Sequence, residues 1–474
     1  MRRYFMHHST LSVDGILSCI SYASRGKFIL FLGACGTGMS ALCRLLFHQG
    51  VSVRCFDDSM GGEYTTLVCE SIPFLSDVNA PLRDCALIVY SLAVPEEHPL
   101  VQNEIPKCSR AQLLGALMRE YPCRIAVAGS HGKSTVTALI HRLLMLSGKD
   151  PTTLSGASLG EGEGTLHIGG KEYFLYECCE YRDSFLYTAP THAVLLNLEL
   201  DHTDYFPDIE AIKASFLRFS NLADTVLYAS FDQRLRELMP KCHARCLSLG
   251  FGSEASALSD DFTGVIKERR NGRYSFDFFV KEDETSAYIE AEIPGRVGAI
   301  NTAFALAMTT IVGISIQETT KYTKQLTSIS RRMMKIGVLN GHAVYYDFAH
   351  HPTEIRATIE ALGEMYGAPP CVVFAPHTFS RTRDFLGAFA DALMLCQRVY
   401  LCPIYAAREQ PIEGISSQAL AVAIGAKASL TASLSDLSAL CEGGAIVLMG
   451  AGDLNEIKER IERDPAFVRE KEGI

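Results

Sequence analysis

The sequence predicts an α/β protein of several domains, each built on an open sheet of mostly parallel strands. Three short apolar stretches, at residues 27–33, 125–128 and 343–347, each lead into a glycine-rich or polar turn and then into a helical pattern. This order of strand, turn and helix is typical of α/β folds, whose ligands bind where the strands end. The length of 474 residues is enough for about three domains.

The first region is predicted to bind a dinucleotide or the diphosphate of a nucleotide sugar. Its first strand enters a turn that contains Gly33, Gly36 and Gly38, and a helix and a second strand follow. Glycines at such a turn let the backbone approach a diphosphate, and Asp57, just after the second strand, is the acidic candidate for the ribose or base. Because the spacing is G-x-x-G-x-G and not G-x-G-x-x-G, a purely structural tight turn is the alternative.

The second region carries a phosphate loop between the strand at 125–128 and a predicted helix at 136–146. Backbone amides of such a loop point at phosphate oxygens, and the helix start and the Lys133 ammonium add positive charge. Ser134 is placed to bind the Mg²⁺ that accompanies a nucleoside triphosphate. The alternative is a glycine-rich turn with a surface lysine. The loop residues predicted to bind ATP are Gly129, Ser130, His131, Gly132, Lys133, Ser134 and Thr135.

Two later segments of this region place metal-binding side chains beyond strand ends. Glu177 ends the predicted strand at 173–177, and His202 follows the predicted strand at 193–197. Both should lie on the side of the sheet that carries Lys133, and Mg²⁺ prefers oxygen ligands while tolerating an imidazole. The alternative for Glu177 is a carboxylate at a helix start, and the alternative for His202 is an ordinary loop histidine.

The third region, from about residue 328, is predicted to be a second open α/β sheet with two polar clusters at strand ends. Asp347, His350 and His351 precede a proline that favours the start of a helix. Arg381 follows another predicted strand, where an arginine suits a carboxylate or a phosphate. For the histidine cluster the alternative is helix capping, and for Arg381 it is a plain salt bridge at a helix start.

Composition limits the partners. The formal net charge of −10 argues against nucleic acid or an anionic membrane surface as the main partner. The 16 cysteines do not have the spacing of a disulfide framework or a metal site, so we expect them to be reduced. With no stretch of 18 apolar residues and no signal-peptide core, the sequence predicts a cytoplasmic protein without membrane insertion.

Taken in order, these motifs resemble the Mur ligase family, over residues 27 to about 455. Several blocks in one order make the resemblance specific. The matching blocks are the phosphate loop, Glu177, Asn197…Asp201-His202, Pro294-Gly-Arg296…Asn301, Arg331-Arg332, Tyr346-Asp347…His350-His351-Pro352, Pro376-His377…Ser380-Arg381-Thr382, Tyr405-Ala-Ala…Glu409 and Gly450-Ala-Gly452-Asp453.

The resemblance implies a three-domain Mur ligase architecture. A Rossmann-like N-terminal domain (1–122) would bind a UDP-sugar, a P-loop central ATPase domain (123–327) would bind ATP, and a Rossmann-like C-terminal domain (328–474) would close on an amino acid. The implied activity is ATP-dependent ligation of L-alanine to the lactyl carboxylate of UDP-N-acetylmuramate through an acyl phosphate, in peptidoglycan precursor synthesis. Its cofactors would be ATP and Mg²⁺, and the protein would be a monomer or a homodimer.

The resemblance also implies roles for individual residues. Arg381 would bind the anionic intermediate or the alanine carboxylate, and Asp347 and His350 would serve the metal and amino-acid side. The implied catalytic residues are Lys133, Asp347, His350 and Arg381; the implied Mg²⁺ ligands are Ser134, Glu177 and His202; the nucleotide contacts beyond the phosphate loop are Asn301 and Arg332; the UDP-sugar contacts are Gly33, Gly36, Gly38 and Asp57.

The chain departs from the family pattern in four places. Val297 and Gly298 stand where the family has a histidine and an asparagine beside the adenine, Thr378 replaces an arginine, Arg408 replaces a glycine, and Cys35 replaces a glycine of the UDP turn. The missing adenine-side pair motivates one alternative function, a non-catalytic regulatory relative that binds UDP-muramyl precursors. A ligase that recycles a muramyl acceptor with a peptide as amine donor is the other.

Overall fold

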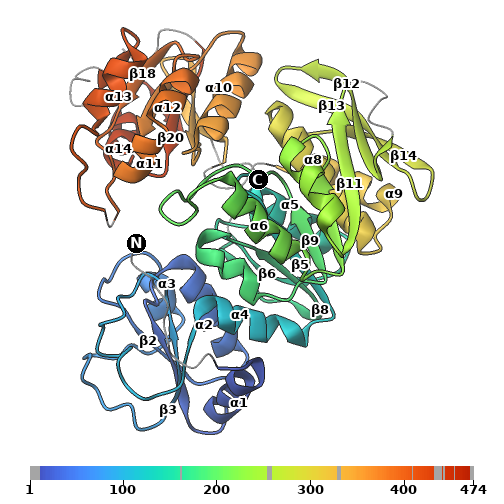
Figure 1. Cartoon of the computed structure of the whole chain (residues 1–474). Helices are drawn as coiled ribbons and strands as arrows, with labels where there is room; N and C mark the ends of the chain where they lie inside the picture. Colours follow the sequence, from blue (N-terminus) through green and yellow to red (C-terminus); the bar gives the residue numbers. More distant parts are fainter. Residues whose placement is uncertain are drawn as a thin grey trace.

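The computed structural model describes residues 11–160, 163–253, 259–327, 332–407, 409–431, 440, 444–452 and 454–469. Arg331, Arg408 and Asp453, named above, lie outside these ranges. The predicted α/β class is confirmed, with three sheets that follow one another along the chain (Figure 1). The predicted domain limits remain predictions, and the second of them adjoins residues outside the described ranges.

The N-terminal sheet is wholly parallel, in the order β2-β1-β3-β4. Its strands are β1 (Phe28–Leu32), β2 (Val53–Phe56), β3 (Cys85–Tyr90) and β4 (Lys107–Ser109), and its helices are α1 (Val13–Ala23), α2 (Thr37–His48), α3 (Tyr64–Cys69), α4 (Arg110–Leu117) and η1 (Met118–Glu120). Every residue of β1 is buried, because parallel sheets are covered on both faces. The sequence analysis did not predict α1, which Ser12 caps and which packs against α4 and β3.

The central sheet has the order β14-β13-β12-β11-β10-β9-β5-β8-β6-β7. Its strands are β5 (Cys123–Ala128), β6 (Pro151–Leu154), β7 (Leu166–His167), β8 (Gly170–Glu177), β9 (His192–Leu195), β10 (Thr225–Ala229), β11 (Arg245–Gly252), β12 (Phe262–Arg270), β13 (Arg273–Val280) and β14 (Thr285–Glu290). Its helices are α5 (Lys133–Leu146), η2 (Tyr181–Tyr187), α6 (Ile209–Ser220), α7 (Gln233–Leu238), η3 (Met239–Lys241), α8 (Gly295–Ile311), α9 (Ile316–Thr319) and η5 (Thr320–Gln325). The strands β5, β8 and β9 are parallel neighbours, so their carboxyl ends meet at one edge.

The C-terminal sheet has the order β19-β18-β17-β20-β16-β15-β21. Its strands are β15 (Met334–Leu339), β16 (His342–Asp347), β17 (Cys371–Ala375), β18 (Arg398–Leu401), β19 (Ala428–Leu430), β20 (Ile446–Gly450) and β21 (Phe467–Arg469), and its helices are α10 (Pro352–Tyr366), α11 (Phe379–Asp384), α12 (Leu386–Leu393), α13 (Ser417–Ile424) and α14 (Asn455–Arg463). The five strands from β19 to β16 are parallel, and β15 and β21 add an antiparallel edge.

The cysteines of the described ranges are all free thiols. This agrees with the expectation of reduced cysteines. Within the same ranges, every helix is too short or too polar to serve as a membrane span.

The C-terminal domain lies against the central domain. In Figure 1, α10 stands beside α8 and the β12–β13 hairpin. Arg269 and Tyr274 of that hairpin contact the Glu364 carboxylate of α10 at 2.8 and 3.2 Å. A Cβ on Gly295 would lie only 2.8 Å from the Ala361 side chain, so the small residue permits the close approach of the two helices.

The N-terminal domain meets the central domain through α4, which packs against η2. A Cβ on Gly115 of α4 would overlap the backbone oxygen of Tyr187. The glycine therefore sets how closely the two domains approach each other.

We expect Gly115→Ala to destabilise this joint by about 1–3 kcal/mol, the usual cost of inserting a methyl group into a packed contact. Thermal unfolding of the purified protein measures the effect. Gly363→Ala in α10 is the matched control, because apart from its chain neighbours and the backbone of its own helix nothing described lies within 4 Å of its Cβ position. Equal midpoints for the two variants would show that the joint is looser than the structure indicates.

Candidate active site

The phosphate loop runs from the buried end of β5 into α5. Gly129 and Gly132 have φ angles of +140° and +84°, a backbone region that favours glycine. A Cβ on Gly129 would also lie 3.0–3.2 Å from Leu196 and Asn197, so the loop closely approaches the segment after β9. Because α5 begins at Lys133, the positive end of its dipole faces the loop.

Two side chains fasten the loop to that segment. The Asn197 side-chain oxygen accepts from the His131 amide at 2.8 Å, and its nitrogen donates to the His131 carbonyl at 3.0 Å. The Ser130 hydroxyl donates to the Glu199 carbonyl at 3.1 Å and accepts from the Glu199 amide at 2.8 Å. The loop is therefore held in shape by the central domain itself.

The Lys133 ammonium is the centre of the site. Its Nζ donates to the Gly129 carbonyl at 2.6 Å, to the Ser130 carbonyl at 3.2 Å and to Glu180 Oε2 at 3.1 Å. Burial alone would lower the pKa of Lys133, but the nearby Glu180, Cys179 and Glu177 raise it above its usual value. Lys133 is therefore charged and oriented before any phosphate arrives.

Sequence reasoning missed Glu180 as a site residue. Its side chain is fully buried, and besides Lys133 it faces His202, whose Nε2 lies 3.9 Å from Glu180 Oε1. The available signal was the pair of carboxylates at Glu177 and Glu180, three residues apart beyond a predicted strand. That spacing did not reveal which of them the lysine would contact.

The three predicted Mg²⁺ ligands surround the Lys133–Glu180 pair. Ser134 is buried in the first turn of α5. Glu177 is close enough to raise the pKa of Lys133, and the Gly156 amide holds its Oε2 at 2.7 Å. The His202 ring packs on Tyr181, with centroids 4.7 Å apart. A hydroxyl, a carboxylate and an imidazole form a donor set that suits Mg²⁺ with bound waters.

A cavity of about 290 Å³ opens beside the phosphate loop, between the central and C-terminal domains. This is near the lower end of the size range of small-molecule sites. The predicted nucleotide contacts Gly132, Thr135, Asn301 and Arg332 all line it. Asn301 is brought to the loop itself, since a Cβ on Gly132 would lie 3.2 Å from its Oδ1.

The departures at Val297 and Gly298 lie in the same cavity wall. Val297 is 47 % exposed, so the position offers an apolar surface where the family pattern has an imidazole. A Cβ on Gly298 would overlap the Ile293 carbonyl, so this backbone accepts no asparagine there. The two substitutions therefore fit the local structure and leave the cavity open.

The structure places Asp347 in the wall of this cavity, beside the predicted nucleotide contacts. Asp347 accepts from the Ala349 amide at 3.0 Å and from the Thr358 hydroxyl at 2.8 Å, and burial raises its pKa. His350 lies near the Arg381–Asp201 pair, since both of these charges influence its pKa. Burial lowers the pKa of His350, which keeps the ring neutral.

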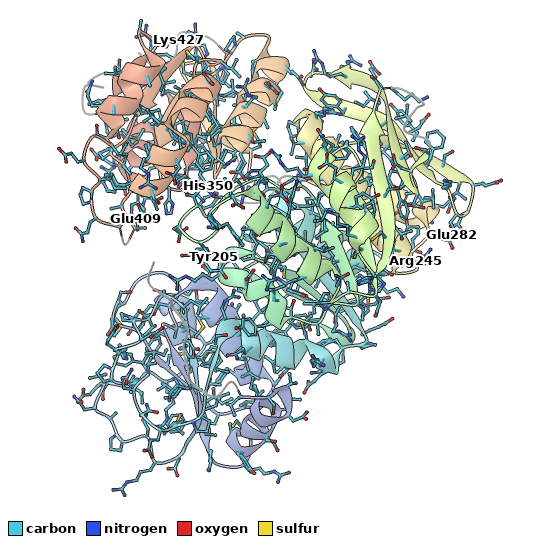
Figure 2. The ribbon with its side chains drawn as sticks, in the orientation of Figure 1. Tyr205, Arg245, Glu282, His350, Glu409 and Lys427 are labelled. Carbon is cyan, nitrogen blue, oxygen red and sulfur yellow. The ribbon has the colours of Figure 1, made fainter. Side chains whose placement is uncertain are left out.

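Arg381 joins the two domains. Its Nη2 donates to Asp201 Oδ1 at 2.8 Å, across 180 residues of sequence. Burial alone would raise the pKa of Asp201, but the nearby Arg381 and His202 hold the pKa of this carboxyl well below its usual range. In Figure 2, His350 and Glu409 lie on the side of the C-terminal domain that faces the loop of Tyr205.

A second charged contact crosses the domain boundary at His131. Its Nε2 lies 3.4 Å from Glu199 and its Nδ1 lies 3.5 Å from Glu354. Burial would lower the pKa of His131, but these two carboxylates raise it to about 9. His351 caps α10 by accepting from the Thr353 amide, so the capping alternative describes its observed contact.

The predicted UDP-sugar residues gather at the start of α2. Gly33 has a φ of +78°, and Gly36 caps the helix without a side chain. Asp57 shapes this turn: its Oδ2 accepts from the Cys35 amide at 2.8 Å, and its Oδ1 accepts from the Ser59 amide at 3.0 Å. Its contact with a sugar or base remains a prediction.

Known proteins resemble the chain along its length. The family model "Mur ligase middle domain" matches residues 127–309, and "Mur ligase, glutamate ligase domain" matches residues 331–452. A UDP-N-acetylmuramate–L-alanine ligase of Acetivibrio thermocellus is 33 % identical and covers 93 % of this chain and 97 % of its own length. The corresponding ligase of Alkaliphilus metalliredigens is 34 % identical, with 92 % and 97 % covered. The chain belongs to the Mur ligase family.

Solved structures agree with the fold of this Mur ligase. The UDP-N-acetylmuramate–alanine ligase of Thermotoga maritima superposes with a TM-score of 0.73 at 21 % identity, covering 92 % of this chain and 98 % of that one. A murein peptide ligase of Psychrobacter arcticus reaches a TM-score of 0.68, also at 21 % identity, with 92 % and 98 % covered. At this identity the likeness concerns the fold alone.

The pKa of His131 predicts a pH-dependent domain contact. A group whose pKa rises on folding, here from 6.5 to about 9, stabilises the folded state fully below pH 6.5 and no longer does so above about pH 9. The melting temperature should therefore fall across this window, and His131→Gln should flatten the fall. His243→Gln, at an exposed histidine, is the control. An unchanged slope in His131→Gln would contradict the assignment.

Gly156 tests the predicted metal site. A Cβ there would lie 2.9 Å from both carboxylate oxygens of Glu177, so Gly156→Ala must displace that carboxylate. We expect the affinity for Mn²⁺ to fall about tenfold, as it does when a residue that orients a metal ligand is changed. Electron paramagnetic resonance with a non-hydrolysable ATP analogue measures this affinity. Gly363→Ala serves again as the control. Unaltered Mn²⁺ affinity in Gly156→Ala would argue against Glu177 as a ligand.

Proposed function

We propose that this Mur ligase joins L-alanine to the lactyl carboxylate of UDP-N-acetylmuramate, with ATP and Mg²⁺, in peptidoglycan precursor synthesis. Relatives with this activity in their names are 31–34 % identical over at least 90 % of the chain. The observation that carries the proposal is the charged Lys133, held by Glu180 in a phosphate loop beside a cavity that both domains line.

Phosphate transfer from ATP to a carboxylate brings two anions together, so it depends on positive charge and positioning. Lys133, the loop amides and the start of α5 would supply that charge, with the Lys133 ammonium exchanging a loop carbonyl for a phosphate oxygen. Mg²⁺, held by Ser134, Glu177 and His202, would neutralise phosphate charge. The product of this step is an acyl phosphate, with ADP released.

The C-terminal domain would serve the second step. The alanine amine attacks the acyl carbon, the tetrahedral intermediate collapses to the amide, and phosphate leaves. Arg381 would stabilise the anionic intermediate or the alanine carboxylate, because its guanidinium already lies at the domain junction beside Asp201. The pKa of His350 is lowered, so its neutral ring can take the proton that the alanine nitrogen releases as it bonds to the acyl carbon.

Phosphate release with different amines tests the proposal. The purified protein receives UDP-N-acetylmuramate, ATP and Mg²⁺ together with alanine, serine, glycine or the muramyl tripeptide. We expect release with alanine. Release with the tripeptide alone would instead identify a recycling ligase, and binding of both nucleotides without release would identify a non-catalytic relative.

Lys133→Ala tests the central residue. We expect amine-dependent phosphate release to fall far more than tenfold, which corresponds to more than about 1.4 kcal/mol of barrier, while affinity for the UDP-sugar stays nearly unchanged. Lys281→Ala, at an exposed lysine on the central domain, is the control. Turnover within tenfold of the parent protein would show that Lys133 is misassigned.

A further inference from the structure

Arg110 lies beside the glycine-rich turn of the N-terminal domain. It is the first residue of α4, directly after β4, so it lies at the carboxyl edge of the N-terminal sheet, where ligands of open α/β sheets bind. The turn of Gly33–Gly38 follows β1 at the same edge. Arg110 lies across this turn, since a Cβ on Gly38 would be 3.1 Å from its Nη1 and 3.3 Å from its Cδ.

Arg110 also belongs to the helix that joins the N-terminal and central domains. The α4 helix packs against η2, which begins one residue after Glu180, the partner of Lys133. The helix that carries Arg110 therefore connects the UDP turn to the central domain.

No anion compensates this half-buried charge. Among the residues that the structure describes, none forms an ion pair or hydrogen bond with the Arg110 side chain, and the first turn of α4 holds no acidic residue. A cation at the first position of a helix is also disfavoured by the helix dipole. Nearby, Gly36 caps α2 without a side chain, so no side chain satisfies the first amides of this helix.

We propose that Arg110 binds the diphosphate of the nucleotide sugar, together with the start of α2. The identity of the sugar rests on the proposed function. The diphosphate does not, because every UDP-sugar carries one. A guanidinium suits two adjacent phosphate oxygens, and a side chain at Gly38 would crowd the Arg110 side chain in its present position. Arg110 is thus a substrate-binding residue of the N-terminal domain.

Binding calorimetry tests the assignment with UDP-N-acetylglucosamine, which has the diphosphate but no lactyl carboxylate, with UDP-N-acetylmuramate and with ATP. We expect Arg110→Gln to weaken both UDP-sugars equally, by about tenfold or more, as for loss of a charge-assisted hydrogen bond, with ATP affinity unchanged. Arg110→Lys should recover part of the loss. Arg119→Gln, at an exposed arginine just beyond α4, should leave all three affinities unchanged.

The other outcomes overturn the assignment. Weakening of UDP-N-acetylmuramate alone would place Arg110 at the carboxylate, and equal weakening of ATP would place it at the phosphate loop. Unchanged affinities, or a parent protein that binds no UDP-sugar, would remove it from the site. Failure of the ligation proposal is a separate result: a parent protein without alanine-dependent phosphate release still shows the Arg110 effect on UDP-N-acetylglucosamine.

Discussion

The buried ion pair of Lys133 and Glu180 is the constraint on which the rest of the site depends. A buried ammonium is costly unless it is paired and fully hydrogen-bonded, and here one carboxylate and two loop carbonyls satisfy it. The pair can form because β5 and β8 are adjacent parallel strands, so the loop after one faces the residues after the other. Removing either partner alone would leave a buried charge without compensation.

Around this pair the molecule separates two tasks. The central domain fixes the charges that phosphate transfer needs, through the bonds of Asn197 to the loop and through Glu180. The C-terminal domain contributes through contacts that are themselves charged, above all Arg381 with Asp201. If Arg381 has the role proposed above, the residue that attaches the C-terminal domain also stabilises the anionic intermediate.

The sequence alone predicted what is encoded locally. The phosphate loop, its helix and the strand-end positions of Glu177 and His202 follow from short motifs, and the structure gathers them around Lys133. It did not predict partners that are distant in the chain, because the pairing of Arg381 with Asp201 depends on how two domains dock. The role expected for Asp347 stays a prediction, and the structure adds that this residue lines the cavity between the two domains. The choice of Glu180 over Glu177 as partner of Lys133 depends on the turn after β8, which spacing does not describe.

The consecutive arrangement of the three sheets has a consequence for how this protein is made. Each sheet is built from one uninterrupted portion of the chain, so each can fold as it leaves the ribosome, the N-terminal one first. The cavity wall that carries Asp347 is synthesised after the whole central sheet. A nascent chain therefore completes its phosphate loop long before the residues that close the cavity are made.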